Sequence, residues 1–371
     1  MRFGSVAIVG RTNVGKSTFL NAVLGQRLAI TSPVPQTTRD LLLGVAQRED
    51  AQIAFVDTPG LHAPRHELGR RMNAAALEAL RTHDLVLFMT DVGHLPKRPP
   101  LHGSDADLVH SADRRLLSEL PRGTTAVAVV NKVDLLRDKA RLLPYLKALS
   151  EVYPFEALVP TSVLKLSGVE AVVAELTARL PEGPPGYDPE LLTDRPLTFF
   201  VREYVREQVM LQCYAELPHA VAVTVDRFDE GERLTRVEAT IHTEKVGQRG
   251  VLIGKGGERI KAVGTAARLR LEELLGRRVH LTLFVRVTER WKDVPRQLNE
   301  LGYSIAETGE VAVRGGREVE PGQADAPADA GSLQPDASQD GSPAEHVDAR
   351  EQEPGQVGSP VERATEAEGE P

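Results

Sequence analysis

The stretch GRTNVGKS, from Gly10 to Ser17, constrains the fold of this chain more than any other part of its sequence. It fits the pattern GxxxxGK[ST] and directly follows an apolar run, Phe3–Val9, that is typical of a buried strand. A loop of this kind binds phosphate with its backbone N–H groups and with the N-terminus of the helix that follows it. The stretch therefore predicts an α/β fold with a nucleotide site close to the beginning of the chain.

The residues at the end of this loop have distinct expected roles. In such loops the side chain of Lys16 reaches the β- and γ-phosphate oxygens, and the hydroxyl of Ser17 coordinates Mg²⁺. The pattern alone does not distinguish ATP from GTP. The residues of this region that we expect to bind nucleotide are Gly10, Asn13, Val14, Gly15, Lys16, Ser17 and Thr18.

A second motif, Asn131-Lys132-Val133-Asp134, follows another apolar run and indicates which base is bound. The carboxylate of Asp134 can accept two hydrogen bonds from the N1–H and exocyclic amine of guanine, a donor pair that adenine lacks. We expect Asn131 to tie loops together and the stem of Lys132 to cover the plane of the base. A backbone N–H in Ser162-Val163 is a candidate contact to the guanine oxygen, although a plain strand-end turn explains these residues equally well.

The run Asp57-Thr58-Pro59-Gly60 is typical of a loop that senses the terminal phosphate of GTP. We expect Asp57 to hold Mg²⁺ through water and the N–H of Gly60 to meet the γ-phosphate. The stretch Thr37-Thr38-Arg39 offers a hydroxyl and a carbonyl to the same groups, and we favour Thr38 over Thr37. The predicted metal ligands are Ser17, Thr38 and Asp57, and the predicted catalytic groups are Lys16, Thr38, Gly60 and Asn13.

Leu61 follows Gly60, whereas Ras-like enzymes soon carry a glutamine that orients the attacking water. An apolar side chain cannot orient water, so that help must come from elsewhere. Asn13 is one candidate, because in related GTPases an asparagine at this place binds K⁺, whose charge acts as an arginine finger does. The alternative, that Asn13 only braces the loop, stays open.

Residues 1–180 alternate apolar runs with helical patterns, which predicts a mostly parallel sheet with helices on both faces. The expected strands are Phe3–Val9, Leu41–Ala46, Gln52–Val56, Leu85–Thr90, Thr125–Val130 and Ala157–Pro160. Residues 93–107 contain too much proline and glycine for a regular element and are expected to form a surface loop. A linker over 181–196 then leads to a second unit.

Residues 197–317 are expected to form a smaller α+β unit in the order α-β-β-α-α-β, which matches a type II KH domain. The expected elements are a helix over Leu197–Leu217, strands over Ala220–Phe228 and Thr235–Thr243, helices over Gly247–Ile253 and Glu258–Leu275, and a strand over Val279–Thr288. A last helix, Val294–Leu301, must pack on the sheet. We therefore favour an anchoring role for Trp291 and Tyr303 over stacking of their rings on bases.

The loop Gly254-Lys255-Gly256-Gly257 lies between two of these helices, and a GxxG loop in that place clamps about four nucleotides. Segment 241–296 carries a net charge of +7, which suits a phosphate backbone. A solvated basic helix is the alternative. The predicted RNA-binding residues are Gly254, Lys255, Gly256, Gly257, Arg249, Arg259, Lys261 and Arg268.

From residue 318 onward the chain becomes an acidic tail with a net charge of −12, whereas the whole chain carries −8. The tail lacks Phe, Trp and Tyr, so we expect disorder, since it cannot bury enough apolar area to offset the entropy of ordering. Its charge could compete with RNA for the basic face. The single cysteine, Cys213, excludes an internal disulfide, and no run is apolar enough to span a membrane, so we expect a cytoplasmic protein.

Together these motifs resemble the Era family of bacterial ribosome-associated GTPases over roughly residues 3–313. The resemblance rests on GRTNVGKST, QTTRD, DTPG, NKVD, IGKGGERIKAVGTAAR and VHLTLFVRV. One GTPase domain followed by one type II KH domain is specific to that family. The chain departs from it where Thr12 replaces a proline, where TSV replaces an SAL-type turn, in the loop 93–107 and in the tail.

The resemblance implies binding of GTP and GDP with Mg²⁺, hydrolysis of GTP, and docking of the KH domain on the 3′ end of 16S rRNA during maturation of the 30S subunit. It also implies peripheral association with the inner face of the cell membrane, and we expect a monomer. Two other functions stay open. One is an RNA-binding protein for which GTP is chiefly an assembly ligand, and the other is a membrane-associated or cell-cycle signalling GTPase.

Overall fold

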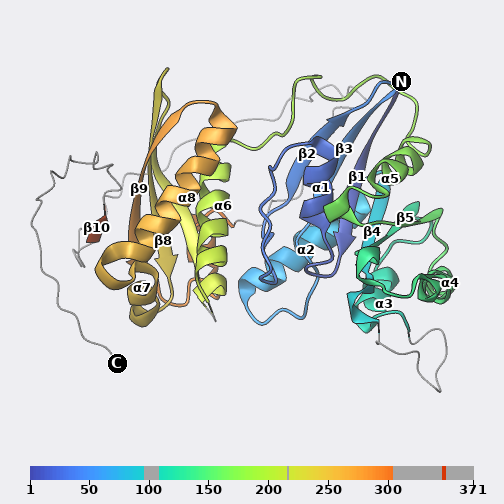
Figure 1. The fold of residues 1–371 in the computed structure, drawn as a ribbon, viewed down its shortest axis with the longest axis horizontal. Helices are drawn as coiled ribbons and strands as arrows, with labels where there is room; N and C mark the ends of the chain where they lie inside the picture. Colours follow the sequence, from blue (N-terminus) through green and yellow to red (C-terminus); the bar gives the residue numbers. More distant parts are fainter. Residues whose placement is uncertain (96–107, 215–216, 304–344, 348–371) are drawn as a thin grey trace, which may run out of the picture.

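The apolar runs of the first part of the chain form a six-stranded sheet in the order β2-β3-β1-β4-β5-β6 (Figure 1). Only β2 and β3 pair antiparallel; the other neighbours are parallel. The strands are β1 (Arg2–Gly10), β2 (Leu42–Gln47), β3 (Ala51–Asp57), β4 (Leu85–Asp91), β5 (Ala126–Asn131) and β6 (Ala157–Pro160). Each end lies within one residue of its predicted place, so the mostly parallel sheet is confirmed. This computed structural model describes residues 1–95, 108–214, 217–303 and 345–347.

Successive residues of a strand point to opposite faces of the sheet, and here each face is buried under its own helices. Val6 and Ile8 belong to the core beneath α1 (Lys16–Leu24) and α5 (Val169–Thr177), whereas Ala7 and Val9 belong to the core of the other face. The helices of that other face are α2 (Glu67–Thr82), α3 (Ser111–Ser118) and α4 (Leu142–Val152). The phosphate-binding loop therefore leaves a strand that is buried on both sides.

Two segments without regular structure were predicted in and after this unit. Of the loop 93–107, the structure describes only its first residues, in and after the 3-10 turn Val92–His94. The linker 181–196 packs on the sheet: the backbone N–H of Val45 donates to Leu192 O at 2.9 Å. The side chain of Gln52 accepts from the N–H of Gly186 at 2.8 Å, and apolar linker residues cover the free face of β2 and β3.

The second unit contains the predicted order α-β-β-α-α-β, in a sheet ordered β10-β9-β8-β7. Its elements are α6 (Leu197–Gln212), β7 (Ala222–Asp229), β8 (Leu234–Thr243), α7 (Val246–Ile253), α8 (Glu258–Leu275), β9 (Arg278–Val287) and α9 (Pro295–Glu300). Strands β8 and β9 are parallel, and β7 and β8 are antiparallel. Helices α6 and α8 lie side by side against this sheet (Figure 1).

The predicted extent of the first helix of this unit, to Leu217, is wrong. Helix α6 ends at Gln212, because Cys213 adopts an extended backbone with φ −114° and ψ 155°. The N–H of Cys213 still closes the last turn by donating to Val209 O at 2.9 Å. Apolar residues continue beyond this point, so the sequence pattern did not reveal the end.

The aromatic residues after β9 anchor the end of the chain's second unit. The side chain of Trp291 is fully buried and donates from Nε1 to Ala220 O at 3.0 Å. Its ring stacks on that of Tyr303, with centroids 5.9 Å apart and an angle of 20° between the planes. The anchoring role is confirmed, because a fully buried ring cannot stack on a base.

The acidic tail lies almost wholly outside the described residues. The described part of the tail is β10 (Glu345–Val347), which pairs antiparallel with β9 at the edge of the second sheet. Among the helices that the structure describes, none is both long and apolar enough to cross a bilayer.

Candidate functional site: a nucleotide pocket and a glycine loop

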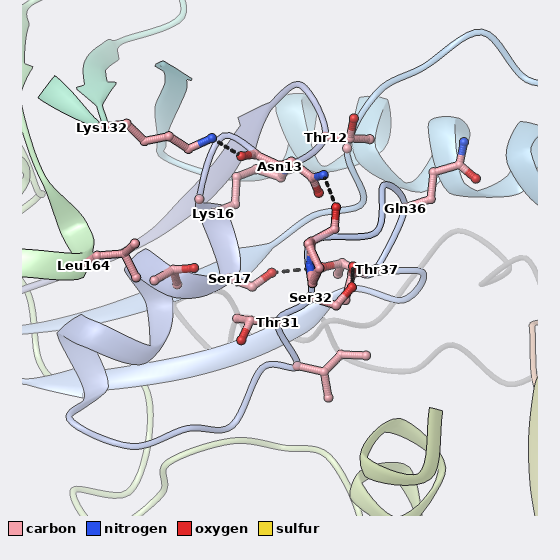
Figure 2. A pocket seen from close by; sticks show the side chains of 16 residues that line it. Thr12, Asn13, Lys16, Ser17, Thr31, Ser32, Gln36, Thr37, Lys132 and Leu164 are labelled. Atoms are coloured by element: carbon pink, nitrogen blue, oxygen red, sulfur yellow. Dashed lines mark hydrogen bonds between the residues drawn. The ribbon is translucent and has the colours of Figure 1, made fainter. Parts of the chain in front are cut away.

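A cavity of about 570 Å³ opens at the carboxyl ends of β1 and β3 (Figure 2). Ligands bind in such crevices in open parallel sheets, because loops that follow neighbouring strands converge there. Of the predicted nucleotide and catalytic residues, those that line the cavity are Asn13, Gly15, Lys16, Ser17, Thr18, Thr38, Gly60 and Lys132. Seven other predicted residues are not part of the lining, and all of them except Asp134 are buried: Gly10, Val14, Asp57, Asn131, Asp134, Ser162 and Val163.

The backbone of the phosphate-binding loop requires glycine at its last turn. Gly15 has φ 110°, and a Cβ placed there would lie 2.4 Å from Asn131 Nδ2. The ammonium of Lys16 is buried and donates to Gly10 O at 3.1 Å and to Arg11 O at 3.0 Å. Burial lowers the pKa of Lys16 to about 8, although Asp57 opposes the effect. The loop thus surrounds the ammonium of Lys16, which lines the cavity where the phosphates would bind.

Three oxygen donors meet beside Lys16, as predicted for a Mg²⁺ site. Ser17 Oγ donates to Asp57 Oδ2 at 2.6 Å and lies 2.9 Å from Thr38 Oγ1. Asp57 Oδ1 is buried without a hydrogen-bond partner in the described part of the chain. Burial raises the pKa of Asp57 to about 6. Hydroxyl and carboxylate oxygens suit Mg²⁺, so this donor set fits the ion.

The structure separates the two threonines of the loop before β2. Thr37 Oγ1 donates to Val34 O at 2.6 Å and lies 2.7 Å from Ser32 Oγ, so its hydroxyl is engaged within its own loop. The hydroxyl of Thr38, by contrast, meets Ser17. The geometry therefore favours Thr38 over Thr37.

Among the described residues, no group of three or more His, Cys, Asp or Glu residues could hold a metal ion.

Gly60 lies directly against the phosphate-binding loop. A Cβ at Gly60 would lie 2.7 Å from Thr12 Cγ2 and 2.8 Å from the Thr12 backbone nitrogen, so only glycine fits. Leu61 forms an isolated bridge with Arg11, and its half-buried side chain packs on the core beneath α2, α3 and α4. Leu61 is not part of the cavity lining, which agrees with the expectation that it does not orient water.

At the guanine end, Asn131 joins three motifs. Its Nδ2 donates to Val14 O at 2.8 Å, and its Oδ1 accepts from Thr161 Oγ1 at 3.2 Å and from the N–H of Val163 at 3.1 Å. This confirms the expectation that Asn131 ties loops together. The N–H of Val163 is therefore already engaged, and a contact between it and the guanine oxygen is not preformed.

The predicted base-reading carboxylate is oriented by a neighbour. Ser162 Oγ donates to Asp134 Oδ1 at 2.6 Å, and this bond lowers the pKa of Asp134. Lys132, with φ 61°, donates from Nζ to Asn13 O at 2.6 Å and to Asp91 Oδ2 at 2.8 Å. The stem of Lys132 is thus fixed along one wall of the cavity, where a base would lie (Figure 2).

Sequence reasoning missed several lining residues. Figure 2 shows Leu164 beside Lys132 at one end of the cavity, where its 85% exposed side chain could cover the base. The position of Leu164 directly after the Ser162-Val163 turn is the sequence signal that could have identified it. The other lining residues outside the predicted set are Thr12 in the phosphate-binding loop and, in the loop before β2 and its approach, Ile30, Thr31, Ser32, Pro33, Gln36 and Thr37.

Asn13 connects two loops of the site. It has φ 63°, and its Nδ2 donates to Pro33 O at 3.0 Å (Figure 2). This bond is the bracing role that was one alternative for Asn13. This bond does not test the K⁺ alternative, because it engages the amide nitrogen of Asn13, whereas a K⁺ ion would bind the amide oxygen.

The glycine loop of the second unit has backbone angles that suit glycine, with φ 75° at Gly254, 60° at Gly256 and 80° at Gly257. A Cβ at Gly254 would lie 2.9 Å from Arg259 Cβ. The loop joins α7 to α8, and the side chains of Lys255 and Lys261 are exposed around it. Arg259 donates to Val251 O, which closes the loop from the side of α8.

The other two predicted RNA contacts lie further away. Arg268 donates to both carboxylate oxygens of Glu272, at 3.0 and 3.1 Å, and lies ten residues along α8 from its start, about 15 Å. Arg249 lies on α7, one turn before the loop. Sequence reasoning missed two exposed apolar side chains on α7, Val246 at its first residue and Val251 near the end that leads into the loop.

Comparisons with known proteins agree with both sites. A family model described as a 50S ribosome-binding GTPase matches residues 5–132, and a KH domain model matches residues 216–292. GTPase Era of Syntrophus aciditrophicus is 39% identical over 303 residues, which cover 81% of this chain and 95% of that protein.

Two solved structures are similar over most of the chain. Aquifex aeolicus Era Y63A bound to GDP·AlF4⁻ gives a TM-score of 0.75 at 33% identity, and covers 82% of this chain and 100% of that chain. An Era complex with MgGDPNP and nucleotides 1506–1542 of 16S ribosomal RNA gives a TM-score of 0.75 at 34% identity, and covers 82% and 99%. By fold, site and sequence, this chain belongs to the Era family of GTPases.

Proposed function

We propose that this protein is a GTP-driven switch that binds 16S rRNA near its 3′ end through the KH unit and assists maturation of the 30S subunit. The observation that carries the proposal is that one chain joins a phosphate-sensing cavity to a basic glycine loop. The solved relative that holds both MgGDPNP and an rRNA fragment supports the same pairing of ligands.

GTP would lie with its phosphates over the loop that ends in Lys16 and with guanine between Lys132 and Leu164. The ammonium of Lys16 would oppose the phosphate charge, and Asp134, oriented by Ser162, would select guanine. Mg²⁺ would be held by Ser17, Thr38 and Asp57, and it supplies positive charge to the β- and γ-phosphate oxygens.

Since Leu61 packs in the core, the attacking water must be oriented by other groups. We assign the Gly60 N–H to the γ-phosphate, where glycine lets the backbone come close. Asn13 belongs to the phosphate-binding loop and is bonded to Pro33 O in the loop before β2, so it joins the two loops that would flank the phosphates. A K⁺ ion beside Asn13 would supply the charge that an arginine finger supplies elsewhere.

RNA binding would begin at the glycine loop. Gly254, Gly256 and Gly257 let a phosphate backbone approach, and Lys255, Arg259 and Lys261 would contact phosphates. Arg268, bonded to Glu272, would have a smaller role than predicted, because a paired guanidinium must first leave its carboxylate. Such contacts give affinity and salt dependence rather than base specificity.

We infer that the protein acts in the cytoplasm, where its proposed rRNA partner lies, and that it acts as a monomer. Peripheral association with the inner face of the cell membrane stays a prediction from the resemblance.

Crosslinking in cells, followed by sequencing of the bound RNA, tests the proposal. We expect a peak at the 3′ end of 16S rRNA that is lost when Lys255 and Gly256 are both changed to Asp. A peak elsewhere, or none above background, would refute the rRNA assignment. GTP hydrolysis measured with and without this rRNA then separates a switch from a protein that uses GTP only as an assembly ligand.

A further inference from the structure

Arg39 belongs to the GTPase unit, but its side chain extends into the KH unit. The residue directly follows Thr38 in sequence and is 6% exposed. Its Nη1 donates to Val221 O at 2.7 Å and to Tyr303 Oη at 3.3 Å. The guanidinium also lies over the rings of Trp291 and Tyr303, 5.6 and 5.9 Å from their centroids. A charged group is thus held by carbonyl oxygens and aromatic faces of the other unit.

Thr38 and Arg39 point to different units although they are neighbours. The hydroxyl of Thr38 meets Ser17 at the predicted metal site, while the guanidinium of Arg39 fills the pocket in the KH unit. Consecutive Cα atoms are about 3.8 Å apart across a planar peptide, so a shift of one residue moves the other. The position of Thr38 is therefore coupled to how Arg39 is seated.

Helix α6 holds the same loop at further points. Glu207 Oε1 accepts from the N–H of Thr31 at 3.0 Å, at the beginning of the loop. Arg202 donates to Asp40 Oδ2 at 3.1 Å, at its end. The loop is thus fixed to the KH unit on both sides of Thr38, and Arg39 makes the contact closest to it.

The segment after the KH sheet also contacts the helix that follows Gly60. Arg71 of α2 donates to Tyr303 O at 2.6 Å, and Leu68 and Met72 pack with Trp291 in one apolar cluster. Tyr303 therefore touches the elements that follow both phosphate-sensing stretches. Seating of Arg39 in this pocket depends on the KH unit being in place.

We propose that Arg39 is a positioning residue for GTP hydrolysis: by docking between Val221, Trp291 and Tyr303 of the KH unit, it holds Thr38 at the γ-phosphate and Mg²⁺ site. We expect Thr38 to contact Mg²⁺ and the γ-phosphate, and GDP lacks the γ-phosphate. Loss of Arg39 should therefore weaken binding of the triphosphate and slow hydrolysis, and should leave GDP affinity nearly unchanged.

The test compares Arg39→Ala and Arg39→Lys with the matched control Tyr204→Phe in the full chain. Tyr204 Oη donates to Arg27 O at 3.0 Å, an interdomain bond outside the loop around Thr38. For Arg39→Ala we expect about a tenfold loss in single-turnover hydrolysis and in GDPNP affinity, with GDP affinity within about twofold. Arg39→Lys should restore part of the loss, and Tyr204→Phe should change neither rate nor preference.

An unchanged hydrolysis rate in Arg39→Ala, or equal losses of GDP and GDPNP affinity, would overturn the proposal. If Arg39→Ala fails to fold, Tyr303→Phe decides. That variant keeps the stacked ring and removes only the hydroxyl that accepts from Arg39. It should lower GDPNP affinity and hydrolysis about two- to threefold without affecting GDP; no selective loss would again refute the proposal.

Discussion

In the nucleotide site most polar side chains already have partners, whereas the lysines around the glycine loop extend into solvent. Asn131 alone makes three hydrogen bonds that join three loops, and Asp134 is oriented by Ser162. Lys255 and Lys261 are exposed on a loop whose shape depends on glycines. In our proposal the first arrangement would select one base by fixed geometry, and the second would attract any phosphate backbone by charge. Single substitutions should therefore be far more damaging and more specific in the first.

The largest effect is expected for Asp134→Asn. This change should lower guanine nucleotide affinity roughly a thousandfold and shift preference toward xanthine nucleotides, because the amide reverses the hydrogen-bond pattern offered to the base. Titration with fluorescent GDP and XDP measures both. The control Ser162→Ala removes only the bond that orients Asp134 and should cost about tenfold. Unchanged guanine affinity in Asp134→Asn would defeat the assignment.

In the KH unit, Lys255→Asp combined with Gly256→Asp should lower RNA affinity about a hundredfold and leave GTP affinity unchanged. Two negative charges then face the phosphates, and the effect should shrink as salt is raised. Binding of an rRNA fragment at several salt concentrations measures this. Arg268→Ala, on the same helix but bonded to Glu272, is the control and should cost much less. If GTP binding is lost as well, the double variant is misfolded and the two sites are not independent.

Protonation of His242 in the KH unit and of Asp57 in the GTPase unit should change the stability of the two units in opposite directions. Burial lowers the pKa of His242 to about 4, between Thr224 Oγ1 at 3.0 Å and Thr288 Oγ1 at 2.9 Å. The unfolded chain therefore binds the proton first, and the KH unit should lose at most about 3 kcal/mol of unfolding free energy as pH falls from 6.5 to 4. Fluorescence of Trp291, the one tryptophan, reports this unfolding.

Asp57 provides the contrast within the same pH range. Its pKa is raised to about 6 by burial, so the folded state takes up the proton before the unfolded state does. Its contribution to the stability of the GTPase unit therefore increases as pH falls below 6. The variant His242→Gln should reduce the loss of unfolding free energy of the KH unit in acid, without changing the pH dependence of the stability of the GTPase unit. An acid response of the KH unit that persists in His242→Gln would show that another group is responsible.

The smallest effect is expected from the monovalent cation. Hydrolysis in NaCl should be about tenfold slower than in KCl, if K⁺ beside Asn13 supplies positive charge to the reacting phosphates. Asn13→Ala should abolish the difference, and RNA binding should not respond to the cation beyond general screening. Equal hydrolysis rates in the two salts would remove the ion and leave Asn13 as a brace to Pro33.

The elements around the nucleotide were predictable because local signals fix them. Strand β1 and the loop that ends in Lys16 follow from one apolar run and one glycine pattern, and all six predicted strands lie within one residue of their observed ends. Long helices with clear ends, such as α8, were also predicted. The end of α6 was not, because no proline or glycine marks Cys213, and the extended backbone there depends on tertiary packing.

The contacts between distant segments could not be predicted from the sequence. Arg39 was noted only as part of the loop that contains Thr38, and its acceptor Val221 O lies 182 residues further along. The pairing of Arg268 with Glu272 follows the i, i+4 spacing of a helix. Whether RNA can displace Glu272 from the guanidinium of Arg268 depends on the geometry of the pair, which the sequence does not give. The linker 181–196 was expected to connect the units, and its packing on β2 and β3 depends on a sheet face that no local pattern marks as free.

The pocket that receives Arg39 has a consequence for the biosynthesis of the protein. Its last wall, Tyr303, is synthesised 264 residues after Arg39. At about 5–20 residues per second, the ribosome needs roughly ten seconds to a minute to reach it. During that time the phosphate site can fold while its loop lacks the docking partner. The nascent chain thus completes its nucleotide pocket before the KH pocket that receives Arg39. A chain whose synthesis is interrupted in between has the nucleotide pocket but lacks the docking site for Arg39.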